Sequence, residues 1–193
     1  MVSFGARQLI IAFLIFVGAA ATTATAEVFT LIFILIISLL LSSPIYKWLK
    51  KTLIKPILVW DIHGVFITGD LELENLYEIK GTKDLIARVR NNYYVVALTN
   101  FNPELFSYYS KKWHLFDMYD ELYNSGDLKA RKPSAEAFER FFKRSGIFKK
   151  DIIFIDDRAE NVDSARKLGI KSIQFKDSVQ TEKALNDLGV KTR

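Results

Sequence analysis

The sequence predicts an α/β fold with a central parallel sheet of about five strands flanked by helices, preceded by one or two transmembrane helices. Two observations predict the sheet. Short apolar runs alternate with segments of helical periodicity through residues 56–193, which is typical of parallel α/β proteins. Several of these runs end in polar residues, as strands do where a site lies at the sheet edge. A third observation, the apolar composition of the first 45 residues, predicts the membrane helices.

The apolar runs and the helical segments can be placed along the chain. The expected strands are residues 57–60, 94–98, 121–124, 152–155 and 171–175. The expected helices are residues 82–90, 103–112, 134–145, 159–168 and 181–188. Pro103 and Pro133 fall near helix starts, where a missing N–H has no cost, and Gly169 follows the fourth helix as a stop signal.

The first 45 residues contain two apolar stretches, residues 9–21 and 28–41, separated by a threonine-rich segment. One helix over residues 4–45 would be roughly 60 Å long, about twice the thickness of a bilayer core. We therefore favour a hairpin in which residues 4–21 cross the membrane and residues 28–45 return.

Two other interpretations of this segment remain open. In the first, it begins with a signal peptide, with Arg7 as the basic region, residues 9–21 as the apolar region and Ala24-Thr25-Ala26 as the cleavage site. In the second, residues 28–41 form a buried helix of a soluble protein. The second is less favoured because the first turn of that helix has no polar face.

The charges divide the chain into three parts: a membrane region (1–45), a basic amphipathic linker (46–55) and a globular domain (56–193). The linker contains Lys47, Lys50, Lys51 and Lys55. By the positive-inside rule, these lysines place the globular domain in the cytoplasm or its equivalent.

The composition of the globular domain excludes several classes of protein. Residues 56–193 carry 22 basic and 21 acidic side chains, so a basic surface for nucleic acid is not expected. The expected partner is instead the lipid bilayer. The chain has no cysteine, which excludes disulfides, thiolate metal sites and cysteine nucleophiles.

Polar residues that could perform chemistry follow the predicted strands or open a predicted helix. They are Asp61 and His63 after the first strand, Thr99 and Asn100 after the second, Lys132 before the third helix, and Asp156 and Asp157 after the fourth strand. In a parallel sheet these strand ends converge. Carboxylates can hold Mg²⁺, while an ammonium and a hydroxyl can contact phosphate oxygens. The set therefore predicts a phosphoryl site with a divalent metal.

The order Asp61…Thr99…Lys132-Pro133…Asp156-Asp157 resembles that of the haloacid dehalogenase (HAD) superfamily of hydrolases. The stretches over residues 126–133 (GDLKARKP) and 155–162 (IDDRAENV) carry the resemblance most specifically. It covers about residues 56–176 and implies a Rossmann-like HAD fold.

The resemblance also implies roles for the candidate residues. Asp61 would attack phosphorus and form an aspartyl-phosphate, while Thr99 and Asn100 would bind the phosphate together with Lys132. Asp156 and the neighbouring Asp157 would hold Mg²⁺, with the backbone carbonyl of His63 as a further ligand. The expected function is that of a membrane-anchored, Mg²⁺-dependent phosphatase.

The chain departs from the family pattern at His63, where the usual residue is an acid/base aspartate. A neutral imidazole can accept a proton from water. A nearby divalent cation disfavours the imidazolium form, so His63 would be an adequate base but a weak acid. The alternative function is a catalytically impaired HAD-like domain that serves as a membrane scaffold, phosphate sensor or complex subunit. A dehalogenase is less favoured, because family dehalogenases enclose the substrate under a cap.

No cap domain fits in this chain, since only residues 66–98 separate the first two motifs. That length allows a short flap over residues 66–80 and one helix. An open site cannot by itself exclude water from a small substrate. We therefore expect a large substrate such as a phosphoprotein, or a partner subunit that covers the site.

Overall fold

The structure, a computed structural model, describes residues 50–70 and 75–193. The predicted membrane-crossing segments, residues 4–21 and 28–45, lie outside the described residues. Among the residues that are described, no helix is both long enough and apolar enough to cross a bilayer.

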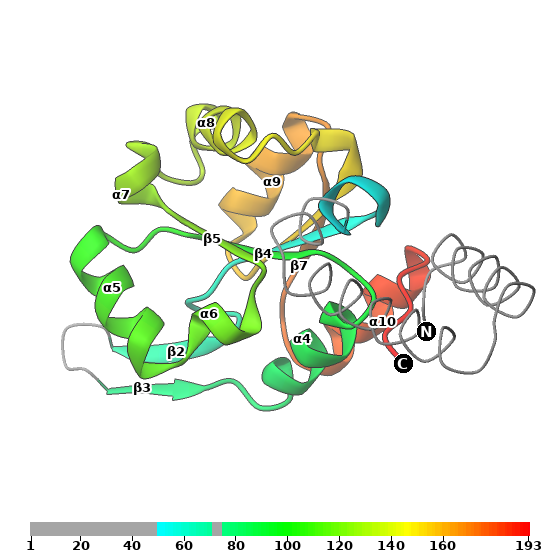
Figure 1. The fold of residues 1–193 in the computed structure, drawn as a ribbon, viewed down its shortest axis with the longest axis horizontal. Helices are drawn as coiled ribbons and strands as arrows, with labels where there is room; N and C mark the ends of the chain where they lie inside the picture. Colours follow the sequence, from blue (N-terminus) through cyan, green and yellow to red (C-terminus); the bar gives the residue numbers. More distant parts are fainter. Residues whose placement is uncertain (1–49, 71–74) are drawn as a thin grey trace, which may run out of the picture. The chain divides into compact units, whose positions relative to one another are not determined.

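A five-stranded parallel sheet forms the centre of the domain (Figure 1). Its strands are β1 (Ile57–Trp60), β4 (Val95–Thr99), β5 (Glu121–Asn124), β6 (Ile152–Asp156) and β7 (Lys171–Gln174). They lie in the order β5-β4-β1-β6-β7, and every pair of neighbours is parallel. The predicted sheet is confirmed, with β1 at its centre between β4 and β6.

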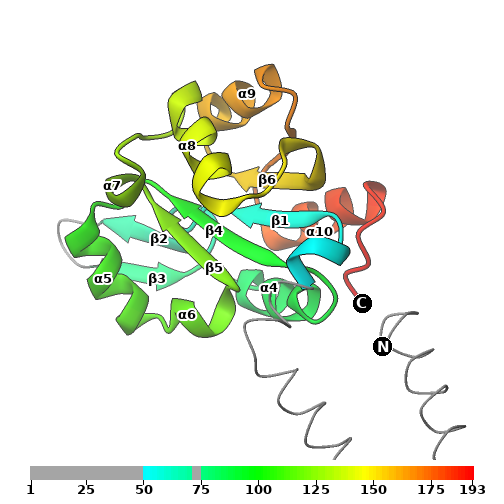
Figure 2. The same ribbon diagram turned by 45° about the horizontal axis from the view of Figure 1, so that its top comes forward.

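Helices cover both faces of this sheet, as Figure 2 shows. One face packs against α4 (Thr82–Arg90), α5 (Pro103–Lys112), α6 (Leu115–Met118) and α10 (Ser178–Asp187). The other packs against α7 (Ser125–Leu128), α8 (Ala135–Ser145) and α9 (Ala159–Lys167), and a 3₁₀ turn, η1 (Lys149–Asp151), leads from α8 into β6.

The central strand is buried on both faces, and its side chains alternate between two apolar cores. Leu58 and Trp60 pack with the α4 side, while Ile57 and Val59 pack with the α8 side. This alternation follows from the two-residue period of a strand. It also explains why the sequence of β1 is continuously apolar.

The predicted boundaries agree with most of the observed elements, with one clear difference at α10. This helix begins at Ser178 instead of residue 181, because the Asp177 side chain accepts a hydrogen bond from the Gln180 backbone N–H at 2.7 Å and caps the helix. The short helices α6 and α7 were not predicted, since four residues are too few to show a period.

The predicted flap contains an antiparallel hairpin of β2 (Ile67–Asp70) and β3 (Asn75–Glu78). Between β1 and β4 the described chain holds only this hairpin and α4, and between β4 and β5 it holds only α5 and α6. Neither insertion amounts to a separate cap domain in the described part of the chain.

Candidate active site

The predicted site residues come together at the carboxyl edge of the sheet. Asp61 directly follows the central strand β1. Thr99 and Asp156 are the last residues of β4 and β6, the two strands that flank β1. Lys132 reaches the same place from the loop that joins α7 to α8. The convergence follows from the parallel order, in which neighbouring strands all end at one edge.

The Lys132 ammonium connects the two buried carboxylates of the site. Its Nζ lies 3.0 Å from Asp61 Oδ1 and 2.7 Å from Asp156 Oδ2, and it donates to the Leu98 carbonyl at 2.7 Å. Lys132, Asp61 and Asp156 are all buried. An ammonium has three hydrogens to donate, and this geometry provides one acceptor for each.

Asp156 is held by hydrogen bonds on both of its oxygens. The Asn161 amide donates to Oδ1 at 2.9 Å and to Oδ2 at 3.0 Å, and the Arg158 backbone N–H donates to Oδ1 at 3.0 Å. With Lys132 also on Oδ2, this fully buried carboxylate is well compensated. Its main role in this geometry is to hold Lys132 in place beside Asp61.

Asp61 has fewer partners than Asp156. One oxygen accepts a hydrogen bond from the Ile62 backbone N–H at 2.8 Å and also faces Lys132. Burial raises the pKa of Asp61, Lys132 lowers it and the Asp156 carboxylate raises it, and together they bring this pKa to about 7. A second cation at this site would favour the ionised form that a nucleophile needs.

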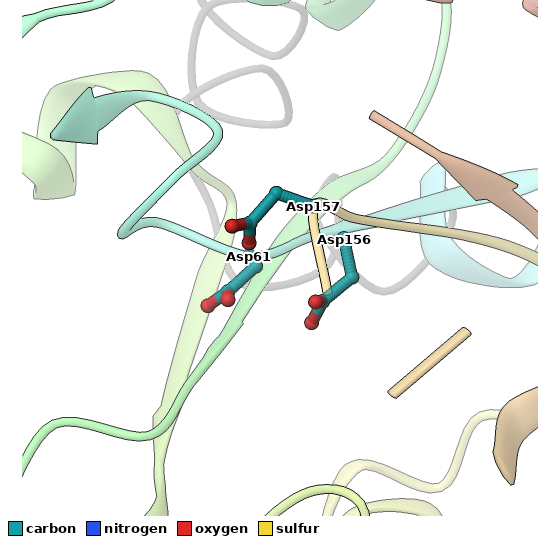
Figure 3. A group of neighbouring side chains, drawn as sticks. All are labelled: Asp61, Asp156 and Asp157. Carbon is teal, nitrogen blue, oxygen red and sulfur yellow. The ribbon is translucent and has the colours of Figure 1, made fainter. Parts of the chain in front are cut away.

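The carboxylates of Asp61, Asp156 and Asp157 face a common space between the ends of β1 and β6 (Figure 3). One oxygen from each lies within 4.8 Å of the others. Asp157 Oδ1 is buried and accepts no hydrogen bond from the described residues, and burial together with Asp156 raises the pKa of Asp157. Carboxylate oxygens that lack a nearby positive charge are suitable ligands for a hard divalent cation such as Mg²⁺.

Gly64 shapes the space beside Asp157. Its φ of +85° is in the left-handed region, and a Cβ added there would lie 2.3 Å from the Asp157 carboxylate. Only glycine allows the backbone after β1 to pass this close to that carboxylate.

Thr99 and Asn100 lie at the carboxyl end of β4, as predicted, but their side chains differ in their hydrogen bonds. Thr99 Oγ1 is buried and has no hydrogen-bond partner among the described residues, so it is available to a ligand. The Asn100 amide is already paired with the Lys132 backbone, donating to its carbonyl at 2.9 Å and accepting from its N–H at 3.0 Å. Asn100 therefore fixes the loop that carries Lys132.

His63 lies beside the carboxylates but is tied to the flap. Its Nε2 is 3.0 Å from the Gly69 carbonyl, which can only accept, so Nε2 carries the proton and Nδ1 is the nitrogen left to act as a base. The ring also meets Phe101 edge-on, with centroids 6.3 Å apart. The hairpin strand β2 and Phe101, two residues after β4, together orient the imidazole.

Asn161 and Gly64 are the site residues that sequence reasoning missed. The Asn161 amide donates to both oxygens of Asp156. Its position in the first turn of α9, five residues after Asp156, was the available signal. For Gly64, the signal was a glycine three residues after Asp61.

Comparison with known proteins agrees with this geometry. The sequence profile of haloacid dehalogenase-like hydrolases matches residues 40–175. The chain belongs to this family.

Curated relatives of the chain include two hydrolases. D-ribitol-5-phosphate phosphatase of Bacteroides thetaiotaomicron is 32% identical over 97 residues, which cover 47% of each chain. Flavin mononucleotide hydrolase 1 of Arabidopsis thaliana is 29% identical over 135 residues, covering 65% of this chain and 55% of the relative. The chain thus matches about half of the length of these relatives.

Solved structures share the fold of this HAD-like chain. A HAD family enzyme of Bacteroides thetaiotaomicron, solved as an aspartate-to-alanine mutant with magnesium and inorganic phosphate, gives a TM-score of 0.56 at 22% identity. The match covers 64% of this chain and 95% of that one. At 22% identity this similarity supports a shared fold and nothing more specific.

Proposed function

We propose that this HAD-like chain is a Mg²⁺-dependent phosphatase that attacks phosphate esters or acyl phosphates with Asp61 and is attached to a membrane by its N-terminal segment. The observation that carries the chemistry is the Lys132 bridge at 3.0 Å from Asp61 and 2.7 Å from Asp156, with Asp157 alongside. The name of one curated relative, D-ribitol-5-phosphate phosphatase, agrees with it.

The proposed reaction has two displacements at phosphorus. An oxygen of Asp61 attacks, the bond to the leaving oxygen breaks, and the phosphoryl group is transferred to the carboxylate. Water then attacks the aspartyl-phosphate, which frees inorganic phosphate and restores Asp61. Lys132 offsets charge on the nucleophile and on the phosphoryl oxygens, and Thr99 Oγ1 donates to one of these oxygens.

A bound Mg²⁺ would neutralise phosphoryl charge as a Lewis acid. Asp157 and Asp61 are the favoured protein ligands, since both Asp156 oxygens already accept hydrogen bonds from Lys132, Asn161 and Arg158. The backbone carbonyl of His63 stays a predicted ligand.

His63 is the proposed proton acceptor for the water step. Its Nδ1 is the nitrogen free to take the proton, because Nε2 donates to the Gly69 carbonyl. A neutral imidazole can take a proton from water but has none on Nδ1 to give to a leaving group. Leaving groups that depart without protonation, such as acyl and aryl oxygens, should therefore react fastest.

Membrane attachment is supported by the two apolar stretches at residues 9–21 and 28–41. The chain reaches β1 from residues 50–56 at the amino edge of the sheet, whereas Asp61 lies at the opposite edge. A domain tethered in this way turns its site away from the bilayer and toward the cytoplasm. The uncapped site then favours a phosphoprotein, or a partner subunit that closes over it, above a lipid in the same membrane.

The test is hydrolysis by the full-length protein in mild detergent, with acetyl phosphate and p-nitrophenyl phosphate as substrates. We expect turnover that requires Mg²⁺ and is lost in Asp61→Asn. We also expect His63→Asp to retain or raise the rate, because it supplies an acid/base carboxyl group. If the unmodified chain and His63→Asp are both inactive and bind no Mg²⁺, the proposal fails in favour of a scaffold or sensor.

A further inference from the structure

Basic side chains without an acidic partner in the described part of the chain gather at the amino edge of the sheet, opposite the site. This edge is formed by the ends of α8 and α9, by η1, and by the helical turn at residues 50–53 that leads into β1. The exposed basic residues of this edge without an ion pair among the described residues are Lys143, Arg144, Lys149, Lys150, Lys167 and Lys171. We name these six residues, with Leu53 and Phe148, the amino-edge face.

Three acidic residues near this edge are each paired with a lysine. Lys50 is buried and lies 3.0 Å from Asp120, Lys51 lies 2.8 Å from Glu121, and Lys55 lies 3.1 Å from Asp151. Three lysines of the predicted linker are thus committed to the domain. What remains on the amino-edge face is positive charge, although the domain as a whole is nearly balanced.

Two large apolar side chains stand among these cations. Leu53 is 73% exposed and Phe148 is 68% exposed. The Lys55–Asp151 pair joins their segments, which continue into the paired residues Ile57 and Ile152. Figures 1 and 2 both show α8 beside α9 on one side of the sheet.

We propose that the amino-edge face lies on the surface of an anionic lipid bilayer, with Leu53 and Phe148 in the interfacial layer and the surrounding lysines on lipid phosphates and carboxylates. Apolar side chains bordered by lysine and arginine are what interfacial binding requires. The inference rests on the proposed membrane attachment and adds to it a contact made by the folded domain itself.

Three observations favour a bilayer over other occupants. The described chain leaves the domain at Lys50, on this edge, and the sequence before it is the apolar region at residues 9–41. A second copy of the chain would bring like charges together, which opposes pairing through this face. An exposed leucine such as Leu53 contributes little to binding a nucleic acid, whereas its transfer from water to a lipid interface is favourable.

The test uses the absence of cysteine from the chain. A single cysteine, Phe148→Cys, is introduced into the full-length protein and labelled with the environment-sensitive fluorophore NBD. The matched control is Val179→Cys, which is 77% exposed but lies in α10 just after the carboxyl end of β7. Each protein is incorporated into vesicles of phosphatidylcholine alone or of an equimolar mixture with phosphatidylserine.

We expect the label at position 148 to shift to the blue in the mixed vesicles and to be quenched by doxyl-labelled lipid, while the label at 179 stays in water. Each lysine near an anionic surface contributes about a five-fold factor to the local binding equilibrium. The double variant Lys149→Glu and Lys150→Glu should therefore lose the shift, and Lys176→Glu with Lys183→Glu, two exposed lysines elsewhere, should keep it.

Three outcomes would overturn the proposal. The first is a label at 148 that stays in water in both vesicle types, and the second is an equal shift with and without phosphatidylserine. The third is a shift caused by RNA but not by mixed vesicles, which would assign the face to nucleic acid. Phosphatase activity in micelles and resistance of the chain to alkaline extraction from vesicles are measured separately. Failure of the catalytic or attachment proposals is thereby distinguished from failure of this one.

Discussion

Replacing Lys132 with methionine tests the central electrostatic argument of the site. Methionine keeps most of the length and the apolar stem of lysine but removes the ammonium. Asp61 and Asp156 would then be two neighbouring buried carboxylates without their shared cation, and the Leu98 carbonyl would lose its donor.

The magnitude follows from the two distances. With an effective dielectric constant of about 20, unit charges at 3.0 Å and 2.7 Å attract by about 5.5 and about 6 kcal/mol. Much of this is offset by the cost of taking the lysine itself out of water. Removing one partner of a buried pair costs about 3–5 kcal/mol, because the remaining charge stays buried and uncompensated. We expect a loss of about 4 kcal/mol in the free energy of unfolding at pH 8.

The loss should depend on pH with a definite sign. Lys132 lowers the pKa of Asp61, so removing it raises that pKa above its present value of about 7, while the unfolded value stays near 3.8. The folded variant then binds protons that the unfolded chain does not bind between these two values. Stability is therefore retained below about pH 4 and is lost as the pH rises toward and through 7.

The assay is urea unfolding of the full-length protein in mild detergent, followed by circular dichroism at pH 5 and pH 8, with EDTA or with Mg²⁺. Lys183→Met is the control, since its ion pair with Asp187 is exposed and should be worth less than about 1 kcal/mol. Mg²⁺ should restore part of the stability of Lys132→Met. Equal losses for the two variants, or the same loss at both pH values, would refute the reasoning.

Three further outcomes are expected. Gly64→Ala should weaken Mg²⁺ binding and reduce turnover at least about ten-fold, because the added Cβ would displace the Asp157 carboxylate. Gly146 also has a positive φ but has open space around it, so Gly146→Ala should leave Mg²⁺ binding and turnover unchanged. Mg²⁺ affinity should rise with pH up to about 7 and then level off as Asp61 ionises, and calorimetry in two buffers should detect proton release at pH 6 that disappears in Asp61→Asn. His63→Asp should raise the rate with alkyl phosphates more than with acetyl phosphate, so equal gains in kcat/KM for both would contradict the assignment of His63 as a base without acid function.

The sequence predicted the sheet well because its signals are local. Strand β1 is a continuous apolar run, and the helix over residues 103–112 begins at a proline. The hairpin of β2 and β3 was predicted only as a flap, since its strands have four residues each and only one buried residue in each strand. The start of α10 depended on a single capping side chain, Asp177.

The sequence predicted which residues form the candidate site, but not which hydrogen bonds each of them makes. Asp61, Lys132 and Asp156 converge as the strand order requires. The sequence could not tell that Asn100 is taken up by the Lys132 backbone, or that Asn161 holds Asp156. These are contacts between residues up to 32 positions apart, and they depend on side-chain directions that no periodicity encodes.

The amino-acid sequence alone determined the α/β class, the apolar region before residue 46 and the polar residues that follow the strands, because each depends on neighbouring residues. The tertiary structure decided that Asp61 and Asp156 share the Lys132 ammonium, that Asp157 Oδ1 accepts no hydrogen bond from the described residues, and where the charges gather. Residues 56–193 contain 22 basic and 21 acidic side chains, so their sequence shows almost no net charge. Folding places the carboxyl ends of the strands at one edge and the ends of α8 and α9 at the other, so the acidic site and the basic face separate in space.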